Sequence, residues 1–199
     1  AEAERLIAIA RSGDRDVLGE LLDHYRQYLR VLADVGIDER YQAKVDPSDL
    51  VQETFIEAQC DFGSFRGTTE RELMMWLKQM LAHNLTDHVS RRYDAQKRDV
   101  QLERSIRQKL DHTSHVMDRG LIVAEPSPST IAERREQALL LANALDGLPE
   151  DYREVLLLRH LKGLNFPDVA KRMGRTEGSV QQLWARALAE LRRRIGDEP

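Results

Sequence analysis

The chain has 199 residues, of which 32% are charged and only 6% are aromatic. This mixture suffices for helical cores but is thin for a β-sandwich, which uses more β-branched and aromatic side chains. No apolar run approaches the roughly 18 residues of a membrane-spanning helix, and the acidic start of the chain shows no secretory signal. The single cysteine, Cys60, excludes an internal disulfide and a multi-cysteine zinc site. The composition therefore predicts a mostly helical, cytoplasmic protein with no membrane partner.

Charge is distributed unevenly, although the net charge is only −4. Residues 1–87 carry 10 basic and 17 acidic side chains, whereas residues 88–109 carry seven basic and three acidic ones. Residues 170–194 carry seven basic and two acidic side chains. Two basic stretches in an acidic chain suggest two places where a polyanion such as DNA could lie, although basic helix faces are often only solvated.

Capping residues and glycines mark the helix boundaries in the first half of the chain. A first helix is predicted to end at Gly13, and a second to run from a cap at Asp14 or Asp16 to about Gly36. The next helix is predicted over 46–60, because an N-cap aspartate followed by proline begins it.

A glycine-containing loop, residues 61–68, follows, and a capping box formed by Thr69 and Glu72 opens another helix. Beyond its first turns the polar continuation through Arg91 to Leu110 can stay helical but loses its apolar stripe. Helical spacing of apolar residues predicts one buried face for this helix, made by Leu73, Trp76, Leu77, Met80 and Leu81.

A linker is predicted over residues 96–130, because one glycine and two prolines interrupt the pattern after Leu110. It separates an N-terminal domain, 1–95, from a C-terminal domain, 131–199. The predicted fold class is therefore all-α, with two small helical domains joined by a flexible linker.

The second domain ends in two helices with the spacing of a helix-turn-helix, 166–173 and 177–195, joined by a tight turn at Gly174. Two helices are predicted before them, the first opened by a capping box of Thr130 and Glu133 and the second over 148–163. An antiparallel hairpin in a helical bundle gives a similar pattern, but spacing and charge together favour DNA binding. Short, amide or basic side chains suit base edges in a major groove, and those predicted to point outward are Ser179, Gln181, Gln182, Ala185 and Arg186.

Phe62 and Phe65 lie among the glycines of the 61–68 loop, upstream of the first basic stretch. Aromatic rings on a loop beside basic residues can stack on unpaired bases. Taken alone, the residues favour the other interpretation, in which both rings close the core.

Nothing in the sequence indicates an enzyme, a metal site or a cofactor. No Gly-rich phosphate loop follows a strand, and the neighbour of Cys60 is acidic, which disfavours a nucleophilic thiolate. His112 and His115 lie in the linker with no second ligand pair at zinc spacing.

Four stretches occur together in an order that is typical of one family: DPSDLVQETFIEA (46–58), FGSFRG (62–67), MMWLKQMLAHNLTDHVSRR (74–92) and the segment from LPEDYRE to ALAELR (148–192). They resemble the bacterial RNA polymerase sigma factors of the sigma-70 family, in particular the two-domain extracytoplasmic-function (ECF) branch. The resemblance covers nearly the whole chain apart from the linker. Residues 126–145, joined to LPEDYRE, also resemble a subgroup known from planctomycetes.

The resemblance implies that residues 1–95 form sigma region 2, which docks on core RNA polymerase, recognises the −10 promoter element and melts DNA. The helix that docks on the clamp of the largest polymerase subunit is matched by Asp49, Gln52, Glu53, Phe55 and Ile56. The loop that captures a flipped base, and the helix beside the opened strand, are matched by Phe62, Ser64, Phe65, Arg66, Asn84, Arg91 and Arg92. The stretch between Phe65 and Trp76 is slightly longer than is usual in the family.

The resemblance also implies that residues 131–199 form sigma region 4, which reads the −35 element. A more basic run usually stands where this chain has Gln181, Gln182 and Leu183, so base preference does not transfer. The −35 contacts are matched by Arg175, Thr176, Ser179, Gln181, Gln182, Ala185 and Arg186.

The partners implied are core RNA polymerase (the clamp of its largest subunit and the flap of its second-largest), promoter DNA and, as is typical of the family, an anti-sigma factor. No catalytic activity is expected. The alternative is a free-standing helix-turn-helix regulator with a helical sensor domain in residues 1–110. A purely protein-binding adaptor is disfavoured by the basic stretch in the last helices.

Overall fold

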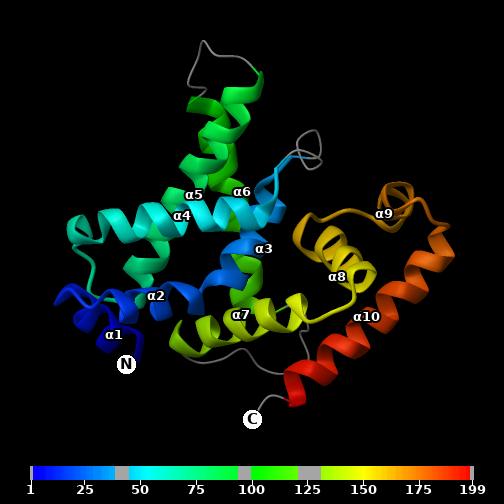
Figure 1. The fold of residues 1–199 in the computed structure, drawn as a ribbon. Helices are drawn as coiled ribbons and strands as arrows, with labels where there is room; N and C mark the ends of the chain where they lie inside the picture. The colour runs from blue at the N-terminus through cyan, green and yellow to red at the C-terminus, as the bar shows by residue number, and fades with distance from the viewer. Residues whose placement is uncertain (1, 39–44, 94–99, 121–130, 198–199) are drawn as a thin grey trace. The chain divides into compact units, whose positions relative to one another are not determined.

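The computed structural model describes residues 2–38, 45–93, 100–120 and 131–197. Within these ranges every regular element is helical, so the predicted all-α fold class is confirmed (Figure 1). The chain divides into two compact units, Ala1–Asp111 and His112–Pro199, and each unit has its own buried core. Across the described ranges, no helix combines the length and the apolar character that crossing a bilayer requires.

The first unit packs its helices around buried leucines. α4 lies against α3 and α5, and α1 lies against α2. The fully buried residues of this unit include Leu21, Leu22, Leu29, Leu32, Leu50, Leu73, Leu77, Leu81 and Leu85. The elements are α1 (Glu2–Arg11), α2 (Arg15–His24), α3 (Arg26–Gly36), α4 (Pro47–Asp61), a 3₁₀ turn η1 (Phe62–Ser64), α5 (Glu70–Tyr93) and the larger part of α6 (Val100–Arg119).

The predicted helix starts of the first unit are confirmed. The Asp46 carboxylate accepts a hydrogen bond from the backbone N–H of Ser48 (2.7 Å), and Pro47 occupies the first turn of α4. At the start of α5, the N–H of Glu72 donates to the Thr69 hydroxyl (3.3 Å), and the N–H of Thr69 donates to the Glu72 carboxylate (3.0 Å). Reciprocal bonds of this kind satisfy donors that the first helical turn otherwise leaves unpaired.

The single helix predicted from Asp14 to Gly36 is wrong, because α2 and α3 are separate helices that meet at Tyr25. The backbone of Tyr25 has φ −97° and ψ 1°, and its side chain is fully buried. Its hydroxyl donates to Glu70 Oε1 at the start of α5 (3.1 Å). We attribute the break to this long-range contact, since no glycine or proline marks it.

The conformation predicted for part of the linker is also wrong, because α6 continues as a helix to Arg119. Its apolar residues recur at helical spacing and are buried, which stabilises a helix in an otherwise polar stretch: Ile106, Leu110 and Met117. Gly120 ends it with a φ of 75°. Residues 121–130, including the predicted cap Thr130, lie outside the described residues.

α6 approaches α3 and α5 closely at Gly36. A Cβ added to Gly36 would lie 2.9 Å from side-chain atoms of both Leu85 and Leu110. The absence of a side chain at this position therefore lets the three helices pack together.

The second unit contains α7 (Ile131–Asp146), α8 (Glu150–Leu156), a π-helical turn η2 (Leu157–Leu161), α9 (Phe166–Met173) and α10 (Glu177–Asp197). α10 packs on α7, α8 and α9. The buried residues of this unit include Leu141, Leu145, Val155, Leu156, Val169, Val180, Ala187 and Leu191. This core fixes α9 and α10 relative to each other within the unit.

Candidate functional site

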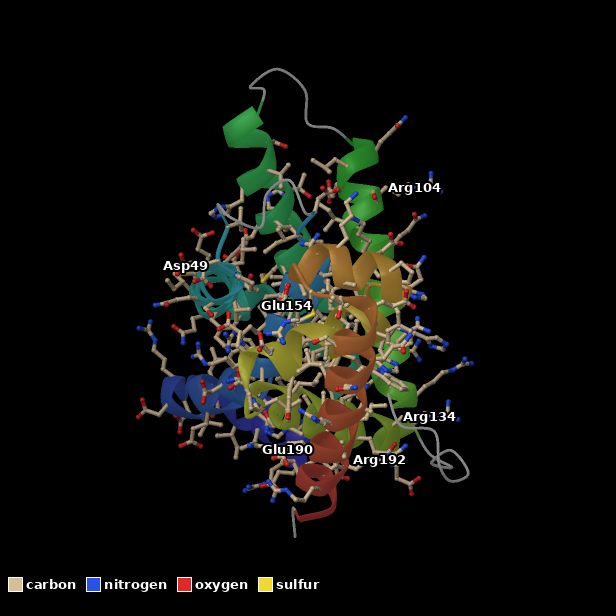
Figure 2. All side chains as sticks on the ribbon, turned by 90° about the vertical axis from the view of Figure 1, so that its right-hand side faces the viewer. Asp49, Arg104, Arg134, Glu154, Glu190 and Arg192 are labelled. Carbon is tan, nitrogen blue, oxygen red and sulfur yellow. The ribbon has the colours of Figure 1, made fainter. Side chains whose placement is uncertain are left out.

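A row of exposed side chains follows one face of α4. Asp49, Gln52, Glu53 and Ile56 recur three and four residues apart, which places them on one side of the helix. Ile56 is 56% exposed, which is unusual for a large aliphatic side chain. Asp49 is labelled in Figure 2, near the start of α4. This docking row, as we call these four residues, offers a protein partner both negative charge and apolar area.

Phe55 does not belong to this face. Its side chain is only 6% exposed, and the guanidinium carbon of Arg26 in α3 lies 5.1 Å from its ring centroid. Because α3 covers the ring, Phe55 offers little surface in this conformation, and its contact with a partner stays a prediction.

Polar side chains tie α4 to α5 beside the docking row. His88 forms a hydrogen bond with Glu53 Oε2 (2.7 Å). The amide of Asn84 donates to the Thr54 hydroxyl (3.2 Å) and to Glu57 Oε2 (3.1 Å). The amide of Asn84 thus contributes to the packing of α5 on α4, and its expected DNA contact stays a prediction.

The two phenylalanines of the 61–68 loop are buried with Trp76 of α5. Phe62 and Phe65 are each 6% exposed. The Phe65 and Trp76 rings are stacked with centroids 5.0 Å apart, and the Phe62 ring lies 5.7 Å from Phe65 and 6.1 Å from Trp76. Each ring is covered by the other rings in this conformation, and the base contact that the resemblance implies for them stays a prediction.

The polar residues of the same loop are accessible. Ser64 and Arg66 are exposed, and the Ser64 hydroxyl donates to the backbone carbonyl of Asp61 (2.8 Å). A cleft of about 350 Å³ lies between the loop and the α1–α2 turn, and its lining includes Arg15 and Arg66. The predicted DNA contacts Arg91 and Arg92 have side chains outside the described residues.

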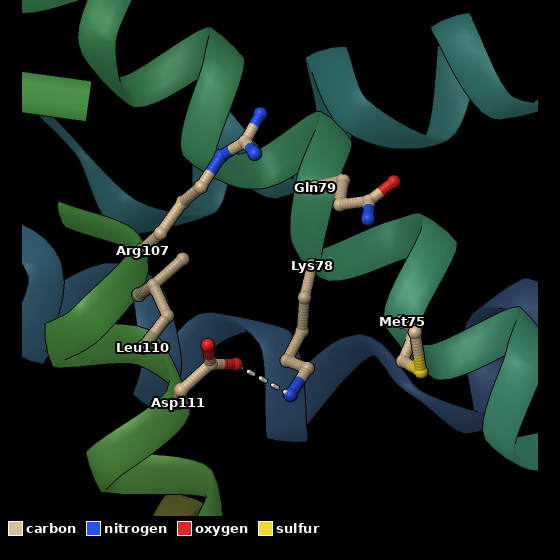
Figure 3. A pocket seen from close by; sticks show the side chains of 6 residues that line it. All are labelled: Met75, Lys78, Gln79, Arg107, Leu110 and Asp111. Atoms are coloured by element: carbon tan, nitrogen blue, oxygen red, sulfur yellow. Dashed lines mark hydrogen bonds and ion pairs between the residues drawn. The ribbon is translucent and has the colours of Figure 1, made fainter. Parts of the chain in front are cut away.

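A smaller hollow of about 170 Å³ lies between α5 and α6 (Figure 3). The Lys78 ammonium forms an ion pair with Asp111 across it (3.0 Å), and Met75 at its edge is 47% exposed. Sequence analysis did not predict this hollow, because it placed residues 96–130 in a linker, whereas α6 forms one of its walls.

The helix-turn-helix of the second unit has the predicted capping. The Asn165 side chain accepts from the N–H of Asp168 (2.9 Å) at the start of α9, and Gly174 ends α9 with a φ of 63°. Thr176 Oγ1 accepts from the N–H of Ser179 (3.3 Å) at the start of α10. These local bonds fix where α10 begins and therefore which of its residues point outward.

The predicted outward face of α10 is exposed at every position. Gln181 donates from its amide to Glu177 Oε1 one turn earlier (3.1 Å), so Glu177, which the sequence analysis left out, belongs to this face. The exposed predicted residues are Ser179, Gln181, Gln182, Ala185 and Arg186.

The basic residues at the two ends of this region are partly paired. Arg175 in the turn forms an ion pair with Asp151 of α8. Near the end of α10, a hydrogen bond from Arg193, with a further one from Arg194, lowers the pKa of Glu190 to about 2. Arg192 beside them is exposed (Figure 2).

A contact that the sequence analysis missed anchors the inner side of α10. The indole N–H of Trp184 donates to His160 Nε2 in η2 (2.9 Å), and the two rings are stacked with centroids 6.1 Å apart. Phe166 meets the Trp184 ring edge-on at 5.5 Å. Because Nε2 accepts, the His160 ring is neutral in this arrangement.

We expect acid to weaken this anchor. Burial, followed by the charge of Arg159, lowers the pKa of His160 below 6.5. The stabilisation of the fold by the Trp184–His160 bond is therefore complete above pH 6.5. It is lost as the pH falls through the folded-state pKa of His160, where Nε2 gains a proton and can no longer accept. The measurement is the NMR signal of the Trp184 indole N–H against pH, with the Trp76 indole as an internal control.

His160→Gln keeps an acceptor and should remove this titration. In the wild type, a Trp184 signal that moves no more than that of Trp76 while the His160 ring signals titrate would show that the His160 bond does not hold the helix.

Among the described residues, no group of three or more His, Cys, Asp or Glu side chains could hold a metal ion.

Comparisons with known proteins find similarity to bacterial sigma factors. The family model described as sigma-70, region 4 matches residues 138–191. The ECF RNA polymerase sigma factor BldN of Streptomyces coelicolor is 27% identical over 201 residues, which cover 100% of this chain and 67% of BldN. The ECF RNA polymerase sigma-E factor of Haemophilus influenzae is 26% identical over 197 residues, which cover 96% of this chain and 94% of that protein. A chain in the solved RsbN–BldN complex aligns with a TM-score of 0.32 at 21% identity, covering 94% of this chain and 97% of that one.

Proposed function

Because the chain belongs to the extracytoplasmic-function branch of the sigma-70 family, we propose that it binds core RNA polymerase, recognises the −10 and −35 promoter elements and promotes DNA opening. The observation that carries the proposal is the region 4 match over residues 138–191, which includes α9, the turn and the exposed face of α10. In this role the chain works in the cytoplasm and has no catalytic activity of its own, since the polymerase supplies the chemistry.

The extent of the similarity disfavours a free-standing regulator. The sigma factors of Streptomyces coelicolor and Haemophilus influenzae match 100% and 96% of this chain, and therefore both units. A helix-turn-helix joined to an unrelated sensor domain would resemble sigma factors only over its C-terminal part. The closer resemblance to a planctomycete subgroup stays a prediction, as does an anti-sigma partner.

We assign the first unit to polymerase docking and −10 recognition, and the second unit to −35 recognition and the polymerase flap. The docking row on α4 supports the first assignment, because acidic side chains around an exposed isoleucine suit a basic protein surface with an apolar centre. The exposed face of α10 supports the second, because its amide and guanidinium groups can pair bidentately with base edges.

At the −10 element, we assign the contact with an unpaired base to the exposed part of the loop. Ser64 and Arg66 are accessible beside the cleft, whereas Phe62 and Phe65 support the loop from inside. Polar contacts and positive charge from the loop, rather than free aromatic faces, therefore hold the base in this proposal.

A gel shift of promoter DNA with and without core polymerase tests the proposed function. Promoter fragments come from selection of bound genomic sites. We expect a specific shifted complex only when polymerase is present, together with permanganate-reactive thymines around the −10 element. Equally tight specific binding by the chain alone, with no opening upon addition of polymerase, would favour the regulator instead.

A further inference from the structure

Arg11, the last residue of α1, reaches the loop that lies more than 50 residues further along the chain. Its guanidinium donates to the backbone carbonyl of Phe65 (3.2 Å) and to that of Gly67. The same guanidinium lies over the Phe65 ring, with its carbon 5.7 Å from the centroid. We propose that Arg11 is a positioning residue for promoter opening, because it clamps the 61–68 loop in the conformation that meets unpaired DNA; this inference rests on the function proposed above.

Glu72 holds the same loop from the other side. Its carboxylate accepts hydrogen bonds from the backbone N–H groups of Thr68 (2.8 Å) and Thr69 (3.0 Å) and from the Thr69 hydroxyl (2.8 Å). The bond from Thr68 is the main cause of the lowered pKa of Glu72, and the charge of Arg11 contributes to it. The loop carbonyls are thus bound by Arg11 and the following amides by Glu72.

Between the two clamps, position 67 has no room for a side chain. A Cβ at Gly67 would lie 2.5 Å from Cζ of Phe65 and 2.6 Å from Cβ of Glu72. The Phe65 ring is in turn stacked on Trp76. The loop backbone is therefore fixed by contacts on each side, and a fixed loop loses less conformational entropy on binding than a mobile one.

Arg11 acts through the loop rather than on DNA. Both bonds come from one nitrogen, Nη2, at the end of the side chain, and the planar guanidinium also lies over the Phe65 ring. A lysine side chain ends one bond closer to the backbone and has no planar group to place over the ring, so it should hold the loop less well. Because the Arg11 guanidinium is bound to two carbonyls, the exposed Arg15 and Arg66, which also line the cleft, are better placed to meet phosphates. Arg11→Lys therefore distinguishes a residue that holds the loop backbone from one that supplies only positive charge.

The experiment compares Arg11→Lys and Arg11→Ala with the wild type, all as reconstituted holoenzymes. Arg5→Ala is the matched control, because Arg5 lies on the same helix and pairs only locally with Glu2 (3.4 Å). The readouts are copurification with core polymerase, permanganate reactivity at the −10 element, and hydrogen exchange of the 61–69 backbone. We expect both Arg11 variants to form holoenzyme and to lose promoter opening by about tenfold. Their loop amides should exchange faster, while the amides of α4 exchange at the wild-type rate. Arg5→Ala should match the wild type in all three readouts.

Opening at the wild-type level in Arg11→Lys would overturn the inference, because positive charge alone would then suffice. Unchanged hydrogen exchange in the loop of both variants would overturn it as well. The double variant Ser64→Ala with Arg66→Ala separates this failure from failure of the proposed function. If that variant opens DNA normally, the loop is not the melting element; if it fails to open DNA while Arg11→Lys succeeds, only the clamp is wrong.

Discussion

The double substitution Gln52→Lys with Glu53→Lys removes the chain from core polymerase: we expect copurification to fall by more than about 100-fold. Both side chains are exposed on the docking row, so the substitutions put two positive charges where the partner surface is proposed to be basic. Like charges facing each other across an interface cost several kcal/mol, whereas surface substitutions typically change folding stability by only about 0.5 kcal/mol. The measurement is a pull-down with tagged core polymerase, alongside thermal unfolding of the free chain.

Two control variants separate docking from packing. Glu53→Gln keeps an oxygen that can bond His88 while it removes the charge, so it should lower copurification far less than the reversal. Glu20→Lys makes the same charge change at an exposed position of α2, outside the docking row, and should have no effect. Normal copurification of the double lysine variant would show that polymerase binds another face of the first unit.

Ile56 contributes the apolar centre of the docking row, and the sequence alone did not distinguish it from Phe55. Both were predicted to contact polymerase, yet Ile56 is 56% exposed and Phe55 only 6%. Adjacent residues on a helix point in different directions, and which one is buried depends on where α3 lies. That placement is a tertiary contact, with Arg26 over the Phe55 ring, and no local pattern encodes it.

Helix starts, by contrast, could be predicted because their signals lie within one turn. Asp46 bonds Ser48, Thr69 exchanges bonds with Glu72, and Asn165 bonds Asp168, all within three residues. Each capping side chain satisfies donors of its own helix, so the surroundings matter little.

The features that sequence analysis missed depend on residues far apart in the chain. The break at Tyr25 coincides with a hydrogen bond to Glu70, and α6 is held by buried residues such as Leu110. Phe62 and Phe65 allowed two interpretations from sequence, and in the structure both rings lie buried beside Trp76. Resemblance to a family transfers the position of a loop but not the side-chain packing inside it.

The largest expected change in promoter preference comes from Arg186→Ala and Gln182→Ala. Both residues are exposed on the outward face of α10, whose phase is set by the Thr176 cap. Arginine pairs bidentately with guanine and glutamine with adenine, and each such pair discriminates against a wrong base by about 1–3 kcal/mol. Each variant should therefore relax preference at one or two base pairs of the −35 element by about 10- to 100-fold and leave the other positions unchanged.

Arg192→Ala provides the matched contrast, because Arg192 is exposed near the far end of α10 whereas Arg193 and Arg194 are bound to Glu190. A phosphate contact carries no sequence information, so this variant should weaken all promoters alike and lower the salt slope of binding by about one unit. Arg175→Ala is less suitable, since it also breaks the ion pair with Asp151. The measurement is selection from a promoter library with each holoenzyme at two salt concentrations. If Arg186→Ala selects the wild-type −35 motif, the reading face of α10 is not the one formed by Ser179, Gln182 and Arg186.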